Sequence, residues 1–293
     1  MKRFWCSFFI FWPIVAVLSC LFAPQRNWWF PGNREASNPL GTQIDDLFYL
    51  ILDITTIVFI GTQIALGYVL WRGSQEHQER AWFTHGSHNL EVVWSIVPAG
   101  ILLFVALYQM DVWANYRIKS HFPKEALASP IAEVTARQFE WRIRYPAPGR
   151  QFRGQKDIDN WLKNPEPGDL HTVNDLHVPT AKPVLIYLRS GDVQHSFFVP
   201  DFRVKQDAVP GQIIPIWWEV TRMRLDDDGN NIGYDLTCAE LCGWGHYKMR
   251  GRVLAQSEDD FHEYLLELQA EQNYDGVAKP APSLAQTKNE VQK

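Results

Sequence analysis

The apolar residues of this chain are concentrated in its first 113 residues, and that distribution constrains the fold most strongly. Three apolar blocks run from Phe4 to Ala23, from about Leu47 to Trp71 and from about Leu90 to Val112. At ~1.5 Å per helical residue, the second and third blocks can each cross ~30 Å of hydrocarbon. A short polar loop, Arg72 to Asn89, separates them. We therefore expect an antiparallel transmembrane helical hairpin over residues 44–113.

The first apolar block follows Lys2 and Arg3. A positive start before an apolar stretch is typical of a signal peptide or of an anchoring helix, so residues 1–24 are predicted to be one or the other. Residues 17–20 loosely resemble a lipoprotein cleavage box, and lipidation of Cys20 stays open as an alternative. The positive-inside rule then places the loop of the hairpin in the cytoplasm and the rest of the chain outside.

Asp53 and Glu91 are ionisable residues in or beside the membrane blocks. Asp53 lies about two turns into the second block, where either a functional role or pairing inside a helical bundle would explain it. Glu91 lies at the start of the third block, where the helix dipole favours a carboxylate whether or not it has a function. Both residues are therefore candidates for function, each with an ordinary structural alternative.

From Ile131 onward the chain changes to short runs rich in strand-forming residues and separated by Pro and Gly. This pattern predicts strands within six ranges: 131–145, 183–188, 193–199, 202–205, 213–220 and 249–255. Many short strands of this kind are typical of a sandwich or barrel. The polar stretch 151–172 is predicted to be a surface excursion, 258–272 an amphipathic helix and 273–293 a disordered tail.

Charge and cysteine content limit the partners and the class of the protein. The 293 residues carry 28 Lys and Arg against 33 Asp and Glu, for a formal net charge of −5. Binding to a phosphate backbone needs clustered positive charge, so the sequence predicts no nucleic-acid partner. The four Cys are too few for a disulfide scaffold.

One segment concentrates side chains that bind metals. Residues 238–249 read Cys-Ala-Glu-Leu-Cys-Gly-Trp-Gly-His-Tyr-Lys-Met and contain two thiols, an imidazole and a thioether: Cys238, Cys242, His246 and Met249. Soft sulfur donors with imidazole select copper or zinc rather than magnesium or calcium. Met is not a usual zinc ligand, and a disulfide between the two cysteines would leave the imidazole and the thioether unexplained.

A second imidazole is available upstream. His195 lies in the segment Gly191-Asp-Val-Gln-His-Ser-Phe, and a lone His in a strand is more often structural. The presence of the metal-binding loop nevertheless makes His195 a candidate ligand. Two thiols, two imidazoles, a thioether and a backbone carbonyl from the loop would serve two coppers bridged by both sulfurs.

With these motifs the sequence resembles subunit II of bacterial heme–copper cytochrome c oxidases, which carries the binuclear CuA centre. The resemblance covers about residues 44–268, and its specific part is C-x-E-x-C-x3-H-x2-M with the upstream D-V-x-H-S-F. It implies a membrane α-helical hairpin followed by an all-β, cupredoxin-like Greek-key sandwich or barrel. The expected division is 1–24 leader or anchor, 44–113 hairpin, 114–272 periplasmic cupredoxin domain and 273–293 tail.

The resemblance implies a role for each metal-binding residue. The ligands would be Cys238 and Cys242 for both coppers, His195 and Met249 for one, and His246 and the backbone carbonyl of Glu240 for the other. The side chain of Glu240 would bind a Mg²⁺ or Mn²⁺ ion shared with subunit I, and a solvated loop acid is the alternative. The segment Val204–Gly211 would dock against subunit I.

The resemblance also implies where electrons arrive. The Trp that receives the electron in the family aligns with Phe139, and Trp141 lies two residues further on, on the same strand face. Either could take this role, and both could equally be ordinary hydrophobic packing. Acidic residues, namely Asp157, Asp159 and Asp226–Asp228, could steer a basic cytochrome. A solvated charged turn explains the triplet Asp226–Asp228 equally well.

The function implied is a one-electron relay within an oxidoreductase that reduces O₂ to water and translocates protons. Electrons would come from cytochrome c or a membrane-bound cytochrome and pass to the heme–copper subunit I, and Glu91 would stand at the entrance of a proton pathway. Other partners would be further oxidase subunits and membrane lipid, in a multi-pass protein of the bacterial inner membrane with a periplasmic C-terminal domain.

Alternative functions are a CuA subunit of another reductase, such as a nitric oxide reductase, and a membrane-anchored copper chaperone. A quinol oxidase subunit would lack the copper ligands.

Overall fold

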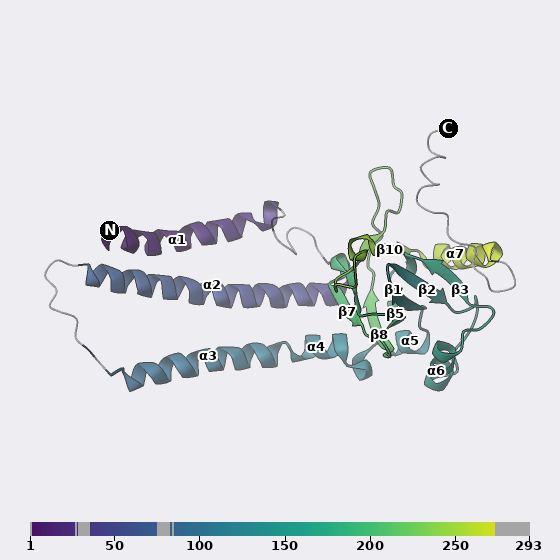
Figure 1. Ribbon diagram of the computed structural model, residues 1–293, viewed down its shortest axis with the longest axis horizontal. Helices are drawn as coiled ribbons and strands as arrows, with labels where there is room; N and C mark the ends of the chain where they lie inside the picture. Colours follow the sequence, from purple (N-terminus) through teal and green to yellow (C-terminus); the bar gives the residue numbers. More distant parts are fainter. Residues whose placement is uncertain (1, 27, 29–35, 75–82, 84, 273–293) are drawn as a thin grey trace. The chain divides into compact units, whose positions relative to one another are not determined.

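The computed structural model describes the chain except for residues 1, 27, 29–35, 75–82, 84 and 273–293 (Figure 1). The chain divides into two compact units. One comprises residues 1–35 and 43–113, and the other comprises residues 36–42 and 114–293. The expected tail, 273–293, and much of the hairpin loop lie outside the described residues.

Long apolar helices make up the first unit. They are α1 (Lys2–Phe22), most of α2 (Pro39–Gly73) and α3 (His88–Tyr108), which α4 (Met110–Arg117) follows. In the described part of the chain, three helical segments are long and apolar enough to cross a membrane: Phe4–Phe22, Pro39–Gly73 and His88–Arg117. Their apolar side chains are largely exposed, Ile57 and Leu102 at 69% each, as expected of helices that face lipid.

Helix α2 begins at Pro39, well before the predicted apolar block. Its 35 residues reach ~52 Å at ~1.5 Å per residue, which exceeds the ~30 Å hydrocarbon core. Asn38 sets the start, because its side-chain oxygen accepts the N–H of Gly41 at 2.7 Å while Pro39 takes the first helical position. The Asn38 amide also donates to the carbonyl of Phe202 at 2.5 Å, so the helix start is anchored within the second unit.

The second unit is a β-sandwich. Among the described residues it has two five-stranded sheets, in the orders β3-β2-β1-β5-β8 and β4-β10-β9-β6-β7. Adjacent strands are antiparallel except for two parallel pairs, β1 with β5 and β4 with β10. The strands are β1 (Ala132–Arg137), β2 (Glu140–Tyr145), β3 (Leu170–Val173), β4 (Asp175–Pro179), β5 (Pro183–Ser190), β6 (His195–Val199), β7 (Val204–Ala208), β8 (Ile214–Glu219), β9 (Tyr234–Cys238) and β10 (Arg250–Gln256). A helical segment followed by an all-β sandwich is the fold class that the sequence predicts.

The structure corrects two details of the predicted elements. The range 131–145 forms a hairpin rather than one strand, because the chain reverses at Gln138 and Phe139 and β1 pairs with β2. The polar range 151–172 contains α6 (Gln155–Lys163), which buries Ile158, Trp161 and Leu162 against the outer face of the first sheet. The strands β4 and β9 were not predicted, and β3 lies at the end of that polar range.

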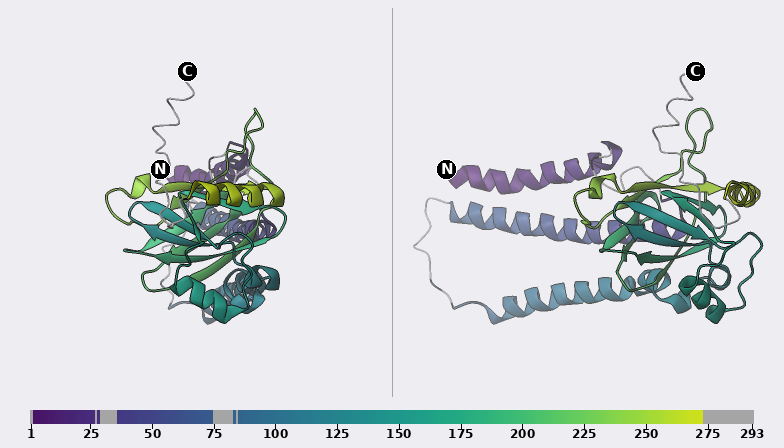
Figure 2. Two further views of the ribbon diagram at one scale, coloured as in Figure 1. Left: turned by 90° about the vertical axis from the view of Figure 1, so that its right-hand side faces the viewer. Right: turned by 45° about the vertical axis from the view of Figure 1, so that its right-hand side comes forward.

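The core lies between the two sheets. Trp141, Phe197 and Trp218 are fully buried there, and the rings of Trp141 and Phe197 meet edge to face at 5.5 Å. Helix α7 (Glu258–Glu271) lies over β3 and β4 and buries Phe261 against this core (Figure 2). The amphipathic helix predicted over 258–272 is therefore present, and it closes one side of the sandwich.

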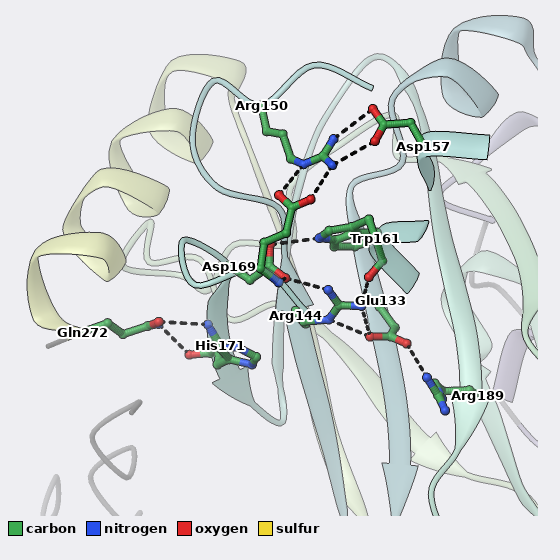
Figure 3. Close-up of polar contacts among 10 residues, drawn as sticks. Glu133, Arg144, Arg150, Asp157, Trp161, Asp169, His171, Arg189 and Gln272 are labelled. Carbon is green, nitrogen blue, oxygen red and sulfur yellow. Dashed lines mark hydrogen bonds and ion pairs between the residues drawn. The ribbon is translucent and has the colours of Figure 1, made fainter. Parts of the chain in front are cut away.

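A buried ion network lies on the outer face of the first sheet (Figure 3). Arg144 donates to Glu133 at 2.7 Å and to Asp169 at 2.6 Å, and all three side chains are buried. Asp169 also accepts the indole N–H of Trp161 and the backbone N–H of Glu166, each at 2.9 Å. A buried charge is costly without its partners. Removing any member of this network would therefore weaken the attachment of α6 to the sheet.

Asp169→Ala is expected to destabilise the second unit by about 3 kcal/mol, because it removes one of two carboxylates from the buried Arg144 and the acceptor of Trp161. Thermal unfolding of the full chain in detergent, followed through its β signal, measures this change. Glu258→Gln is the control, since it removes an exposed ion pair with Lys182, and it should cost less than about 1 kcal/mol. Equal effects of the two substitutions would contradict the role of the network.

Candidate metal centre

The candidate ligands lie at one end of three adjacent strands. The order β10-β9-β6 makes these strands neighbours; β9 ends at Cys238, β6 begins at His195 and β10 begins directly after Met249. Cys238 pairs with Phe197 across β9 and β6, and its N–H donates to the carbonyl of Met249 at 3.2 Å. The sheet therefore brings the two ends of the metal-binding loop together and places His195 beside them.

The two thiols of the loop are free, and their Sγ atoms lie 3.9 Å apart, so they form no disulfide. Cys238 Sγ lies 3.9 Å from His195 Nδ1 and 3.2 Å from the carbonyl oxygen of Glu240. The ligand atoms of His195, Cys238 and Cys242 all lie within 4.8 Å of one another.

The second thiol contacts the remaining donors. Cys242 Sγ lies 3.5 Å from His246 Nδ1 and 3.8 Å from Met249 Sδ. The structure thus brings together all six residues of the sequence motif. Cys242 and Met249 are buried, whereas His246 is partly exposed.

These distances suit two metal ions that share both sulfurs. With metal–sulfur bonds of ~2.3 Å, one ion can contact both sulfurs when they are less than ~4.6 Å apart, and the observed separation is 3.9 Å. Each proposed ion would also find one further ligand beside each sulfur. These ligands are His195 and Met249 for one ion, and the Glu240 carbonyl and His246 for the other. Thiolate and imidazole donors suit copper or zinc, and the added thioether favours copper, because Met is not a usual zinc ligand.

The two thiols differ in proton affinity. Burial alone raises the pKa of Cys238, but hydrogen bonds from the His195 side chain and the backbone at Ser196 outweigh it and lower the pKa. Burial and the neighbouring Cys238 raise the pKa of Cys242. These shifts favour the thiolate at Cys238, and binding of a metal ion at Cys242 would release the proton of that thiol.

Asp192 orients His195, a role that sequence reasoning missed. Asp192 accepts from His195 Nε2 at 2.7 Å, which leaves Nδ1 directed toward Cys238. The same carboxylate accepts the backbone N–H of Gln138 at 2.8 Å, and the Gln138 amide donates to the carbonyl of Cys242 at 2.6 Å. A carboxylate that holds the second nitrogen of a ligand His is a common arrangement, so the Asp three residues before His195 was the available signal.

The two aromatic residues proposed to receive electrons occupy different environments. Phe139 lies in the turn between β1 and β2, half-buried, with its ring against Gly245. Trp141 lies on β2 and is fully buried against Phe197. The expectation that the two share a strand face is wrong, because Phe139 precedes the strand. Trp141 offers no surface to a partner.

The other predicted residues lie apart from the ligands in the sequence and have local explanations. Glu91 is exposed in the first turn of α3, and a Cβ on Gly86 would lie 2.6 Å from its Oε1. Asp157 pairs with Arg150 at 3.2 Å, and Asp226 accepts the N–H of Asn230 at 2.8 Å. These aspartates therefore organise their own loops, which neither requires nor excludes steering of a cytochrome.

The segment Val204–Gly211 contains β7, the edge strand beside β6. His195 pairs with Ala208 across these strands. The first residues of this segment thus support the strand that carries a ligand, while a docking role remains a prediction.

Helices long and apolar enough to span a membrane, a β-sandwich and a two-cysteine metal-binding loop together define a class of membrane-anchored protein with an all-β metal-binding domain. Two family descriptions match the chain: "Cytochrome C oxidase subunit II, transmembrane domain" over residues 26–112 and "Cytochrome C oxidase subunit II, periplasmic domain" over residues 133–256. The chain belongs to the cytochrome c oxidase subunit II family, and it is therefore a subunit of an oxidoreductase.

Curated relatives agree with this assignment. "Alternative cytochrome c oxidase subunit 2" of Bradyrhizobium diazoefficiens is 31% identical over 268 residues, covering 86% of this chain and 88% of the relative. "Cytochrome c oxidase subunit 2" of Cereibacter sphaeroides is 30% identical, covering 80% and 78%. The solved periplasmic domain of subunit II of cytochrome oxidase (CoxB) of Bradyrhizobium japonicum covers 49% of this chain and 95% of its own, with 20% identity and a TM-score of 0.37.

Asp192→Asn is expected to lower the affinity for copper about 10- to 100-fold, because His195 loses the carboxylate that directs Nδ1 toward Cys238. Competition with a copper chelator, titrated against the full chain in detergent, measures the affinity. Asp235→Asn, which changes an exposed carboxylate on β9, is the matched control and should leave the affinity unchanged. An unaltered affinity in Asp192→Asn would show that Asp192 does not position the ligand.

Proposed function

We propose that this chain is the CuA-bearing subunit of a cytochrome c oxidase. It accepts electrons from a cytochrome c donor and relays them to the heme–copper subunit I, which reduces O₂ to water with proton translocation. The observation that carries the proposal is the meeting of two free thiols 3.9 Å apart with two imidazole nitrogens, a thioether and a carbonyl around them.

Bound copper would supply a one-electron couple shared by two ions. Cys238 and Cys242 would hold both ions. His195 and Met249 would complete the ligands of one ion, and His246 and the Glu240 carbonyl those of the other. Asp192 keeps His195 in one orientation, and Gln138 ties the loop backbone at Cys242. A ligand set fixed in this way changes little between redox states, which favours rapid electron transfer. Burial of both sulfurs keeps water away from them.

The chain would lie in the bacterial inner membrane as a multi-pass protein, with the hairpin over 44–113 and the copper domain over 114–272 on the periplasmic side. Subunit I, other oxidase subunits and lipid would be its partners. The side chain of Glu240 supports a shared Mg²⁺ or Mn²⁺ ion. It is half-buried, and among the residues that the structure describes it has no hydrogen-bond or ion-pair partner, although the adjacent carbonyl contacts Cys238.

Copper loading of the full chain is expected to give an electron paramagnetic resonance spectrum in which one unpaired electron is shared by two copper nuclei. Cys242→Ser should convert it to a one-copper spectrum or abolish it, because only one bridging sulfur remains. Cys20→Ser, in α1, is the matched control and should leave the spectrum unchanged. A one-copper or silent spectrum of the unmodified chain would overturn the proposal and favour a copper chaperone.

Glu91 is proposed to stand at the entrance of a proton pathway. Its carboxylate is exposed in the first turn of α3, at the end of a helix that is long and apolar enough to cross a membrane. Glu91→Gln in the assembled oxidase should slow O₂ reduction and proton uptake severalfold, while Glu91→Asp should retain most of the rate. Asp111→Asn, in α4, is the control. Proton uptake at the normal rate in Glu91→Gln would exclude this role.

A further inference from the structure

The metal-binding loop carries three large apolar side chains that face solvent. Leu241, Trp244 and Tyr247 expose 79%, 81% and 68% of their surface, and we call them the loop patch. Leu241 directly precedes the ligand Cys242, and Tyr247 directly follows the ligand His246. Exposed apolar side chains grouped in this way mark sites of protein docking, and Trp and Tyr are enriched at such sites.

Trp244 is held in a defined position by Phe139. Their rings meet edge to face with centroids 5.8 Å apart. The Phe139 ring lies so close to the loop that a Cβ on Gly245 would be 2.4 Å from its Cδ2, and a Cβ on Gly243 would be 3.3 Å from its ring. Gly243 also has a φ of +132°, which favours glycine. The two glycines that flank Trp244 thus let the loop close over Phe139 and turn the indole outward.

A cation lies against the rings of the loop patch. The ammonium of Lys248 lies 5.6 Å from the centre of the Trp244 ring and 5.5 Å from that of Tyr247. Asp157 and Asp226, two of the aspartates proposed to steer a cytochrome, make the contacts described above within other loops. The loop patch thus offers a partner chiefly apolar and aromatic surface, which suits a donor that presents an apolar heme edge.

We propose that Trp244 is the residue at which electrons arrive, and that the loop patch docks the exposed heme edge of the donor cytochrome. The inference rests on the proposed function. Trp244 lies two residues from Cys242 and two from His246. In contrast, Trp141 is fully buried, and Phe139 is half-buried beside Trp244. In the transfer, the ferrous heme iron of the donor loses one electron and becomes ferric, and the copper pair gains it. No bond forms or breaks, and no proton moves.

The test uses the assembled oxidase with small soluble cytochrome c as the probe. Redox-inert zinc-substituted cytochrome c measures docking affinity, and reduced native cytochrome c measures the rate of electron transfer in stopped flow. Trp244→Ala should lower both about tenfold or more, as expected when a central interface Trp is removed. Trp244→Phe, which keeps a ring against Phe139, should retain more of the affinity than of the rate. Leu225→Ala, exposed in the same unit outside the loop patch, is the control and should change neither.

The copper spectrum separates this inference from the proposed function. A two-copper spectrum preserved in Trp244→Phe, together with a slowed rate, supports the assignment of Trp244. Unchanged docking and rate in both Trp244 variants would overturn it, as would loss of subunit I from the purified complex, because subunit I would then cover the loop patch. Absence of a two-copper spectrum in the unmodified oxidase would contradict the proposed function itself.

Discussion

The adjacency of β10, β9 and β6 in one sheet is the constraint on which the metal centre depends. The ladder ties Cys238 to the carbonyl of Met249 and sets β6, which starts at His195, alongside, so ligands distant in the sequence meet without the loop having to organise itself. Fixing both ends of the loop removes much of the entropy that would oppose a defined spacing of two sulfurs. Folding of the sandwich and formation of the site are therefore linked, and each is expected to stabilise the other.

The turn between β1 and β2 is the second support, and it comes from the opposite sheet. Gln138 contacts both Asp192 and the carbonyl of Cys242, so one residue links the segment just before β6 to the loop that carries the thiols. Phe139 packs on the same loop, against Gly243 and Gly245, and its ring meets that of the exposed Trp244. These contacts explain why a hairpin turn, normally a mobile element, is positioned to hold a metal site rigidly. They also connect the two sheets beside the ligands.

The sequence predicted what depends on local patterns, because apolar blocks and ligand spacings are readable without knowing the neighbours. It missed β9, since Asp235 and Thr237 alternate with the buried Tyr234 and Leu236, and a run of five residues with two polar members also fits a loop. It missed α6 although Ile158, Trp161 and Leu162 have helical spacing, because their burial depends on a sheet face that only the tertiary structure provides. Asp192 was part of the motif, but its contact with Gln138 crosses between sheets.

The positions of Phe139 and Trp244 show why alignment to a family pattern cannot by itself assign the residue that receives electrons. The alignment indicates Phe139, which lies beside the metal-binding loop in the structure. How much of its ring is exposed depends on which loop residues cover the ring. Here the Phe139 ring packs so closely on the loop that a Cβ on Gly245 would lie 2.4 Å from its Cδ2. The ring of Phe139 therefore lies under the loop, whereas Trp244, which meets it edge to face, exposes 81% of its surface. Which aromatic side chain reaches the surface is thus decided by the contact between the turn and the loop.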